Sequence, residues 1–217
     1  MTDYLLRLFE DRLAPASEVP LLRPCNRMLY CAEGRFSVGG DWIDANEARH
    51  AGDSIRLRAG KEGARILRFE LVPAPTGDSG HLTAEEATSR QLLAEAITLD
   101  RLDDHLMRCD RVDFPPCGIA YLHTHQGPGI RCLVQGQIRV ETEGHILNRD
   151  PFEAWFEGGP EPVLARASEE AETAFVRVMI LPATLLGQSS ISYVRAEDRD
   201  KSKSQRYTVF QDQLITL

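Results

Sequence analysis

The sequence predicts an all-β protein, and three observations support this. Short stretches of alternating apolar and polar residues are separated by Gly, Pro, Asn and Asp, which mark turns. Helical periodicity is rare, so the strands do not alternate with helices as in an α/β protein. Similar strand segments recur in the same order in both halves of the chain. This pattern favours an antiparallel barrel or sandwich built as two related units.

The expected strands are distributed along the whole chain. They cover 27–32, 35–39, 54–58, 65–72, 107–113, 118–125, 130–135, 137–142, 163–167 and 173–181. A charged run, Arg195 to Arg206, reads as a solvated loop. Tyr207–Leu217 is expected to form a final strand, which could complete either unit or pair with another subunit.

One helix is expected at about 84–97. Thr83 and Glu86 fit a T-x-x-E capping box, and Leu93 and Ile97 are four residues apart. The chain is therefore divided into an N-terminal β unit (1–80), a connecting helix (81–98) and a C-terminal barrel (99–217).

The repeat between the two halves has two parts. Gly34-Arg-Phe-Ser-Val38 resembles Gly136-Gln-Ile-Arg-Val140. Ile66–Ala74 resembles Phe175–Ala183: two apolar residues and Arg come first, and both segments end in apolar-apolar-Pro-Ala. Because the order agrees, two related β units are favoured over one long barrel.

Composition limits the functional classes. The 217 residues are 42% hydrophobic and 27% charged, as in soluble globular proteins, with a net charge of −8. Such a charge disfavours nucleic acid and anionic membranes as partners. The five cysteines include no C-x-x-C pair, so free thiols are expected. No signal-peptide pattern or membrane-length apolar run is recognised, and a cytoplasmic location is expected.

The most informative segment contains His123-Thr-His125. Side chains alternate between the two faces of a strand, so the two imidazoles point the same way, about 7 Å apart along the backbone. They could chelate one divalent metal. Two polar residues on a solvated face, or two hydrogen-bonded barrel histidines, would give the same pattern.

The surroundings resemble the first motif of the cupin superfamily, in which Gly is followed by five residues, His-x-His, a Glu and a closing Gly. Gly118 precedes His123 by five residues, and Gly136 closes the motif. Gly129 occupies the usual Glu position, so one of four usual ligands is missing.

The second cupin motif has a divergent counterpart in Trp155–Val163. When Gly158 is aligned with the motif glycine, Glu161 falls at the position of the third histidine. The resemblance thus implies His123, His125 and Glu161 as ligands of Fe, Mn, Ni or Zn, which is a two-histidine, one-carboxylate set. A barrel that keeps its histidines without metal is the alternative.

The first unit lacks such ligands. Counting back from Gly34, as from Gly136 to the histidines, gives Leu21 and Arg23. The first unit is therefore expected to be a degenerate, metal-free cupin half with a structural role.

Two more residues are candidates for catalysis. Arg131, if it faces into the barrel, could anchor a substrate carboxylate; it could equally lie outward or pair with Glu157 or Glu161. Tyr121 could donate a proton or a hydrogen bond to substrate, although such a tyrosine is more often part of the core.

The resemblance implies a double-stranded β-helix, the cupin jelly roll. It also implies a metal-dependent enzyme, a dioxygenase, isomerase or lyase, acting on a small acidic substrate. The alternative is a non-catalytic cupin that binds or senses a small ligand, and a scaffold with a filled barrel is a third reading. Cupins are often dimers, so a homodimer is expected.

Overall fold

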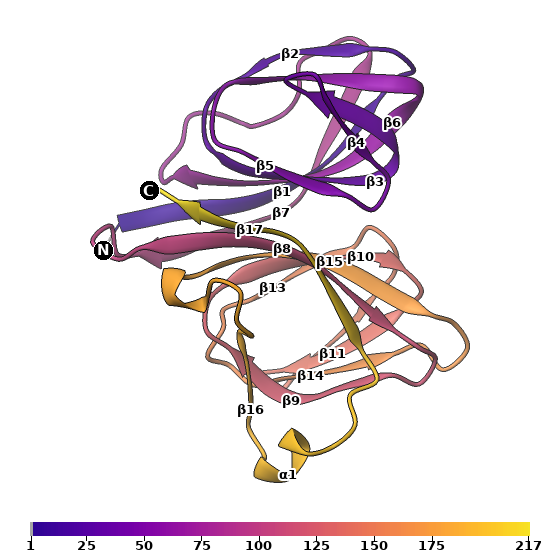
Figure 1. The fold of residues 1–217 in the computed structure, drawn as a ribbon, viewed down its shortest axis with the longest axis vertical. Coiled ribbons are helices and arrows are strands. Elements are labelled where there is room, and N and C mark those ends of the chain that lie inside the picture. The colour runs from indigo at the N-terminus through magenta and orange to yellow at the C-terminus, as the bar shows by residue number, and fades with distance from the viewer. Residues whose placement is uncertain (1) are drawn as a thin grey trace. The chain divides into compact units, whose positions relative to one another are not determined.

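The computed structural model describes residues 2–217, which form two compact units of antiparallel strands (Figure 1). Unit 1 extends to Asp103 and includes Ile215–Leu217, and unit 2 covers Asp104–Leu214. Within the described residues, helix is confined to η1 (Ala183–Leu185) and α1 (Ala196–Arg199). The all-β fold class is therefore confirmed.

Unit 1 is one sheet that curls on itself. Its strands are β1 (Thr2–Leu13), β2 (Glu18–Leu22), β3 (Asn26–Val38), β4 (Asp41–Asp44), β5 (Ala48–Ala51), β6 (Ile55–Pro73) and β7 (Ala87–Leu99). The order is β4-β3-β6-β1-β7, with β2 paired to β6 and β5 paired to β3. The long strands β3 and β6 pair with each other from Asn26 to Val38, and the apolar core includes Leu29, Phe36, Leu57 and Ile66.

Unit 2 contains two five-stranded sheets. Its strands are β8 (His105–Phe114), β9 (Ile119–His125), β10 (Gly129–Gln135), β11 (Ile138–Thr142), β12 (His145–Arg149), β13 (Ala154–Glu157), β14 (Val163–Ala167), β15 (Thr173–Pro182), β16 (Ile191–Tyr193) and β17 (Arg206–Ile215). The sheet orders are β13-β10-β15-β8-β17 and β12-β11-β14-β9-β16. The core between the sheets includes Phe114, Leu133, Val140 and Phe175.

The two units share one topology. In unit 1 the order β5-β3-β6-β1-β7 matches β13-β10-β15-β8-β17 in unit 2. The pairing registers match residues one to one: Leu29 pairs with Arg68 on β6, as Arg131 pairs with Arg177 on β15. The predicted similarity of Ile66–Ala74 and Phe175–Ala183 thus corresponds to equivalent strands.

The repeated glycines have one structural role. Gly34 and Gly136 have φ values of +70° and +71°. A Cβ at either position would collide with the backbone carbonyl of a neighbouring strand end, that of Gly63 or Glu172 respectively. Both the left-handed backbone and the close approach require glycine.

The units also share a β-bulge. On β9, Ala120 pairs with Ala165 of β14 and His123 pairs with Val163. Two residues lie between the paired positions on β9 but only one on β14, so β9 carries one extra residue. On β2, Val19 pairs with Leu57 of β6 and Leu22 pairs with Ile55, so β2 carries one extra residue in the same way. The extra residue reverses which side chains face inward beyond the bulge. The matched register places Leu22 where unit 2 has His123.

The helix expected at 84–97 is wrong. Residues 87–99 form β7, which pairs along β1 with Leu93 opposite Leu8 and Ile97 opposite Tyr4. A spacing of four is even, so Leu93 and Ile97 satisfy a strand's alternation as well as a helical face. Pairing with β1 satisfies the backbone groups of both strands, which outweighs a local capping signal.

Other strands differ from expectation in smaller ways. The long first strand β1 was not predicted, because its charged residues interrupt the apolar alternation. The predicted final strand exists as β17 and pairs with β8 of unit 2. The charged run before it contains the single turn α1 and the buried Asp198.

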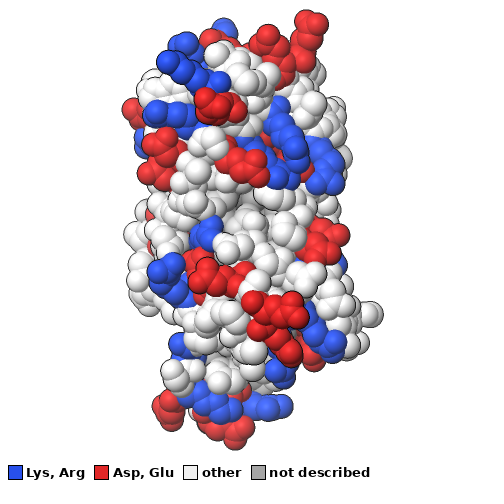
Figure 2. All heavy atoms as spheres, turned by 90° about the vertical axis from the view of Figure 1, so that its right-hand side faces the viewer, with Lys and Arg blue, Asp and Glu red and all other residues white. Residues whose placement is uncertain are grey.

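Acidic and basic side chains are interspersed on the face shown in Figure 2. Among residues 2–217, no helix has the length and apolar character that crossing a lipid bilayer requires.

The glycine at the repeat predicts a graded stability effect. Gly136→Ala should lower the free energy of unfolding by about 3 kcal/mol, because it adds a steric collision to the left-handed backbone. Gly144 also has positive φ, at +77°, but no atom lies within 4 Å of its Cβ position. Gly144→Ala should therefore cost only about 1 kcal/mol. Urea unfolding of both variants measures the difference, and equal losses would show that the collision is relieved.

Candidate functional site

His123 and His125 of β9 point to the same side, as the sequence predicted. Both side chains are buried, and their Nε2 atoms are 3.2 Å apart. The ring centroids are 4.8 Å apart with nearly perpendicular planes. The two imidazole edges therefore converge on one point.

The protonation of this pair is set by its surroundings. His123 Nδ1 lies 2.6 Å from the carbonyl oxygen of Tyr121. Because a carbonyl can only accept, Nδ1 carries the proton and Nε2 presents a lone pair. Burial lowers the pKa of His123, and it lowers the pKa of His125 to about 3 despite an opposing hydrogen bond with Glu157. Both imidazoles are neutral at pH 7, which is the form that binds metals.

The carboxylate beside the histidines is Glu157 of β13. Its Oε2 lies 3.3 Å from His125 Nε2 and 2.8 Å from Arg131 Nη2. Its Oε1 accepts a hydrogen bond of 2.8 Å from Trp155 Nε1. Burial alone would raise the pKa of Glu157, but the Arg131 charge and the His125 hydrogen bond hold it well below its usual range. Glu157 is therefore an ionised, buried carboxylate.

Arg131 faces into the barrel, and it is paired with Glu157. Its side chain is 1% exposed, and Nη1 donates to the carbonyl of Gly129 at 2.6 Å. Burial lowers its pKa to about 10, so it remains charged at pH 7. The sequence analysis left two alternatives for Arg131, an inward position and a pair with Glu157, and the structure shows both.

Glu161 is not brought to the histidines. Within residues 2–217, the structure records no hydrogen bond or ion pair between Glu161 and either ring. Its Oε2 instead lies 2.7 Å from the Cβ position of Gly158. The motif alignment counted residues correctly from Gly158, but the chain turns there before β14 begins. The signal that could have found Glu157 is strand alternation. Trp155 and Glu157 are two residues apart on β13, which pairs with β10, so their side chains lie on the same face of the sheet.

Tyr121 also lies apart from the histidine rings. The bulge in β9 turns Ala120 rather than Tyr121 to the interior side. The Tyr121 ring instead lies below two ammonium groups, 4.9 Å from Lys201 Nζ and 5.4 Å from Lys203 Nζ. Its backbone carbonyl, not its hydroxyl, contributes to the site by fixing the His123 tautomer.

A second ion pair completes the polar interior. Arg177 of β15 donates from Nε and Nη2 to the two carboxylate oxygens of Asp110, at 2.6 and 3.0 Å. This two-point pair is neutral overall and fully buried. Arg177 and Arg131 each have one carboxylate partner, so no buried arginine charge is left over.

The cavity in this interior is small. It has a volume of about 20 Å³, and its walls include both histidines, Glu157, Trp155 and Phe175. A space of that size holds about one water molecule. The barrel interior is filled by aromatic side chains, and an organic substrate has no room beside the histidines in this arrangement.

The spacing of the donors is that of ligands around one metal. Ligands about 2.1 Å from an ion, at angles between 90° and 109°, lie about 3.0–3.4 Å from each other. The His123–His125 and His125–Glu157 distances of 3.2 and 3.3 Å fall in this range. Among residues 2–217, no three His, Cys, Asp or Glu side chains already surround one ion position. The two histidines fit as ligands, and Glu157 would complete the set by turning from Arg131.

Comparisons with known proteins identify the fold. No family model matches the chain, and neither does any curated protein. Solved structures of Bacillus subtilis oxalate decarboxylase are similar: a serine-to-alanine variant gives a TM-score of 0.65 at 11% identity, covering 87% of this chain and 71% of that chain. The same enzyme at pH 4.6 gives 0.65 at 10% identity, covering 87% and 70%. A third structure, studied for its Mn(II) centres, gives 0.64 at 10% identity, covering 87% and 71%.

This likeness shows the fold. The chain has the fold of these structures, a jelly roll of antiparallel strands, in agreement with the fold class predicted from the sequence. At 10–11% identity the reaction of the neighbours is not carried over.

Because Arg131 pairs with Glu157 and not with Glu161, the two glutamates should differ in their contribution to the free energy of unfolding. Glu157→Gln should lower the free energy of unfolding by about 3–5 kcal/mol, because it leaves a buried guanidinium without a counter-charge. Glu161→Gln removes the same charge where no ion pair is lost, from an oxygen that is buried without a hydrogen-bond partner, and should not lower the free energy of unfolding. Urea unfolding at neutral pH compares the two. Equal effects would mean that Arg131 does not depend on Glu157.

Proposed function

We propose that this protein is a metal-dependent cupin whose second barrel binds a divalent transition metal on His123 and His125. The observation that carries the proposal is the convergence of two neutral imidazole Nε2 atoms at 3.2 Å. The hydrogen bond from His123 Nδ1 to the Tyr121 carbonyl orients one ring, as backbone carbonyls commonly do for histidines that bind metals. Similarity in fold to an enzyme with Mn(II) centres adds support.

Glu157 is the third ligand in this proposal, in place of Glu161. A set of two imidazoles and one carboxylate suits Fe(II), Mn(II), Ni(II) or Zn(II) and leaves positions open. Such a metal, when bound, supplies Lewis-acid polarisation or dioxygen activation.

The chain's own residues set the conditions for a substrate. Phe175, Trp155 and the surrounding apolar side chains leave room for about one water molecule and shield the histidines from bulk solvent. Arg131 is the proposed anchor for a small acidic substrate. Because Arg131 is already paired, the substrate carboxylate would replace Glu157 on the guanidinium and release Glu157 toward the histidines. The reaction would be that of a dioxygenase, isomerase or lyase.

A second candidate is a non-catalytic cupin that binds or senses a ligand. The cavity beside the histidines does not separate it from the enzyme, since about 20 Å³ admits neither a substrate nor an organic ligand without rearrangement; a filled interior is typical of the scaffold reading instead. Homodimer formation and a cytoplasmic location stay predictions from the sequence.

Elemental analysis tests the metal directly. Protein purified without a histidine tag or chelator should contain near one transition metal per chain. The His123→Ala/His125→Ala double variant should lose it, and Glu157→Gln should retain much less, because a ligand is removed from the set. Glu161→Gln is the matched control and should keep the full content.

Circular dichroism confirms that each variant is folded before its metal is counted. Equal metal content in the double variant would refute the site. A wild-type chain that takes up no Fe(II), Mn(II) or Zn(II) under anaerobic loading would favour the non-catalytic candidate.

A further inference from the structure

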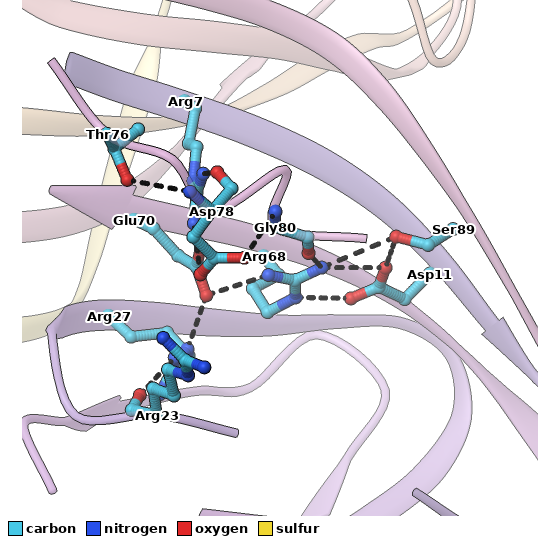
Figure 3. A network of polar contacts seen from close by, with 10 residues as sticks. All are labelled: Arg7, Asp11, Arg23, Arg27, Arg68, Glu70, Thr76, Asp78, Gly80 and Ser89. Carbon is cyan, nitrogen blue, oxygen red and sulfur yellow. Dashed lines mark hydrogen bonds and ion pairs between the residues drawn. The ribbon is translucent and has the colours of Figure 1, made fainter. Parts of the chain in front are cut away.

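The interior of unit 1 contains a cluster of buried charges that the metal proposal does not use. Three arginines and two carboxylates lie on the inward faces of three neighbouring strands, and each is at most 2% exposed (Figure 3). They are Arg7 and Asp11 of β1, Arg27 of β3, and Arg68 and Glu70 of β6.

Glu70 is the centre of this cluster. Its carboxylate accepts from Arg7 Nε at 3.0 Å, Arg27 Nε at 2.7 Å and Arg68 Nη1 at 2.7 Å. Burial alone would raise the pKa of Glu70, but the charges of Arg68 and Arg27 lower it to about 2. Glu70 is therefore ionised throughout the physiological range.

The buried charges do not balance. Asp11 is taken up by Arg68, with hydrogen bonds of 2.6 and 3.1 Å, and Glu70 is shared by three guanidinium groups. Three positive charges therefore face two negative ones. Asp78 adds one carboxylate near Arg7 at 3.5 Å, but its side chain is half exposed, and Arg23 adds a positive charge at the same rim. With these two rim residues included, four arginines face three carboxylates, so one positive charge is in excess at the opening.

In this cluster, Arg27 has a side-chain nitrogen without a hydrogen-bond acceptor. Its Nε is bound to Glu70 and its Nη2 donates to the carbonyl of Arg23 at 2.9 Å. Its Nη1 is buried and meets no acceptor anywhere in the described chain. The exposed Arg23 lies next to it (Figure 3) and forms no ion pair with an acidic residue of the described chain.

These arginines border a large opening. A cavity of about 760 Å³ is lined only by residues of unit 1, with Arg23, Arg27, Arg68 and Glu70 on the charged side. Val19, Leu22 and Leu82 form an apolar side. The volume falls in the range of small-molecule sites, which combine apolar walls with a few placed polar groups.

The loop that borders the cavity is held by the same arginines. Arg7 Nη1 donates to the Asp78 carbonyl and Arg68 Nη2 to the Gly80 carbonyl, both at 2.8 Å. Gly80 has φ +75°, and a Cβ there would meet the Arg7 guanidinium at 2.6 Å. The wall is thus positioned before any ligand arrives.

We propose that unit 1 binds an organic monocarboxylate, with its carboxylate on Arg27 and Arg23 and its apolar body against Val19, Leu22 and Leu82. One negative charge balances the excess of one positive charge, whereas a phosphate dianion would exceed it. Guanidinium groups recognise carboxylates by paired, charge-assisted hydrogen bonds. The site is independent of the metal, because none of its residues belongs to unit 2.

Isothermal titration of the full chain with hexanoate tests this. Hexanoate should bind one per chain, and Arg27→Met and Arg23→Met should each weaken it about ten- to a hundred-fold. Arg56→Met removes an exposed arginine that does not line the cavity and should leave binding unchanged. Hexanamide, which lacks the charge, should not bind.

Urea unfolding gives a second test of the charge balance among the buried arginines and carboxylates. Arg27→Met leaves two arginines facing two carboxylates, so its urea midpoint should equal or exceed that of the wild type. Arg68→Met removes the partner of Asp11 and should lower the midpoint clearly.

Several outcomes would overturn the proposal. These are hexanoate binding that persists in Arg27→Met, hexanamide binding as well as hexanoate, or no binding of hexanoate at all. Inorganic phosphate that binds more tightly than hexanoate would overturn the carboxylate assignment. Binding that depends on His123 or His125 would place the ligand at the metal site instead.

Discussion

In each barrel, one buried arginine on the long inner strand must face a carboxylate on the adjacent strand. Arg68 meets Asp11 in unit 1, and Arg177 meets Asp110 in unit 2, each through two hydrogen bonds. A guanidinium in an apolar interior is tolerated only with such a partner. A register slip of one residue would turn the arginine outward and separate the pair. This pairing therefore favours a single register for the central strands, and every other inward side chain takes its position from it.

Beyond this equivalent arginine, the two interiors differ at several inward positions. Unit 2 has Arg131 where unit 1 has Leu29, and Gly129 where unit 1 has Arg27. In unit 2 the additional arginine is neutralised by Glu157, the charges balance, and about 20 Å³ remains. In unit 1 the additional arginines share Glu70, one charge is left over, and the space above them is open. Unit 2 therefore has a charge-balanced interior with little free space, and unit 1 has an excess positive charge beside an open cavity, where we propose that an anion binds.

Alternation and local spacing were enough to predict much of this. They predicted the shared face of His123 and His125, the inward position of Arg131 as one alternative, and the repeated segments that begin with Gly34 and Gly136. They failed where pairing with a distant strand decides the outcome. An even spacing cannot separate a helix from a strand, so β7 was misassigned. A bulge in β9 turned Tyr121 away, and a turn after Gly158 kept Glu161 from the histidines, where the carboxylate of Glu157 lies instead.

The matched bulges also show why unit 1 should recognise anions differently. Register places Leu22 where His123 stands, so the first barrel cannot offer that imidazole to a metal. A metal ion holds a carboxylate through open coordination positions, and a cluster of arginines holds it through a fixed positive charge. Under the two proposals made above, an apolar side chain in place of the imidazole, together with Arg27 on the next strand, keeps the attraction for a carboxylate without a metal. The same type of barrel can thus attract a carboxylate either through a bound metal ion or through a cluster of arginines, and the two sites do not depend on each other.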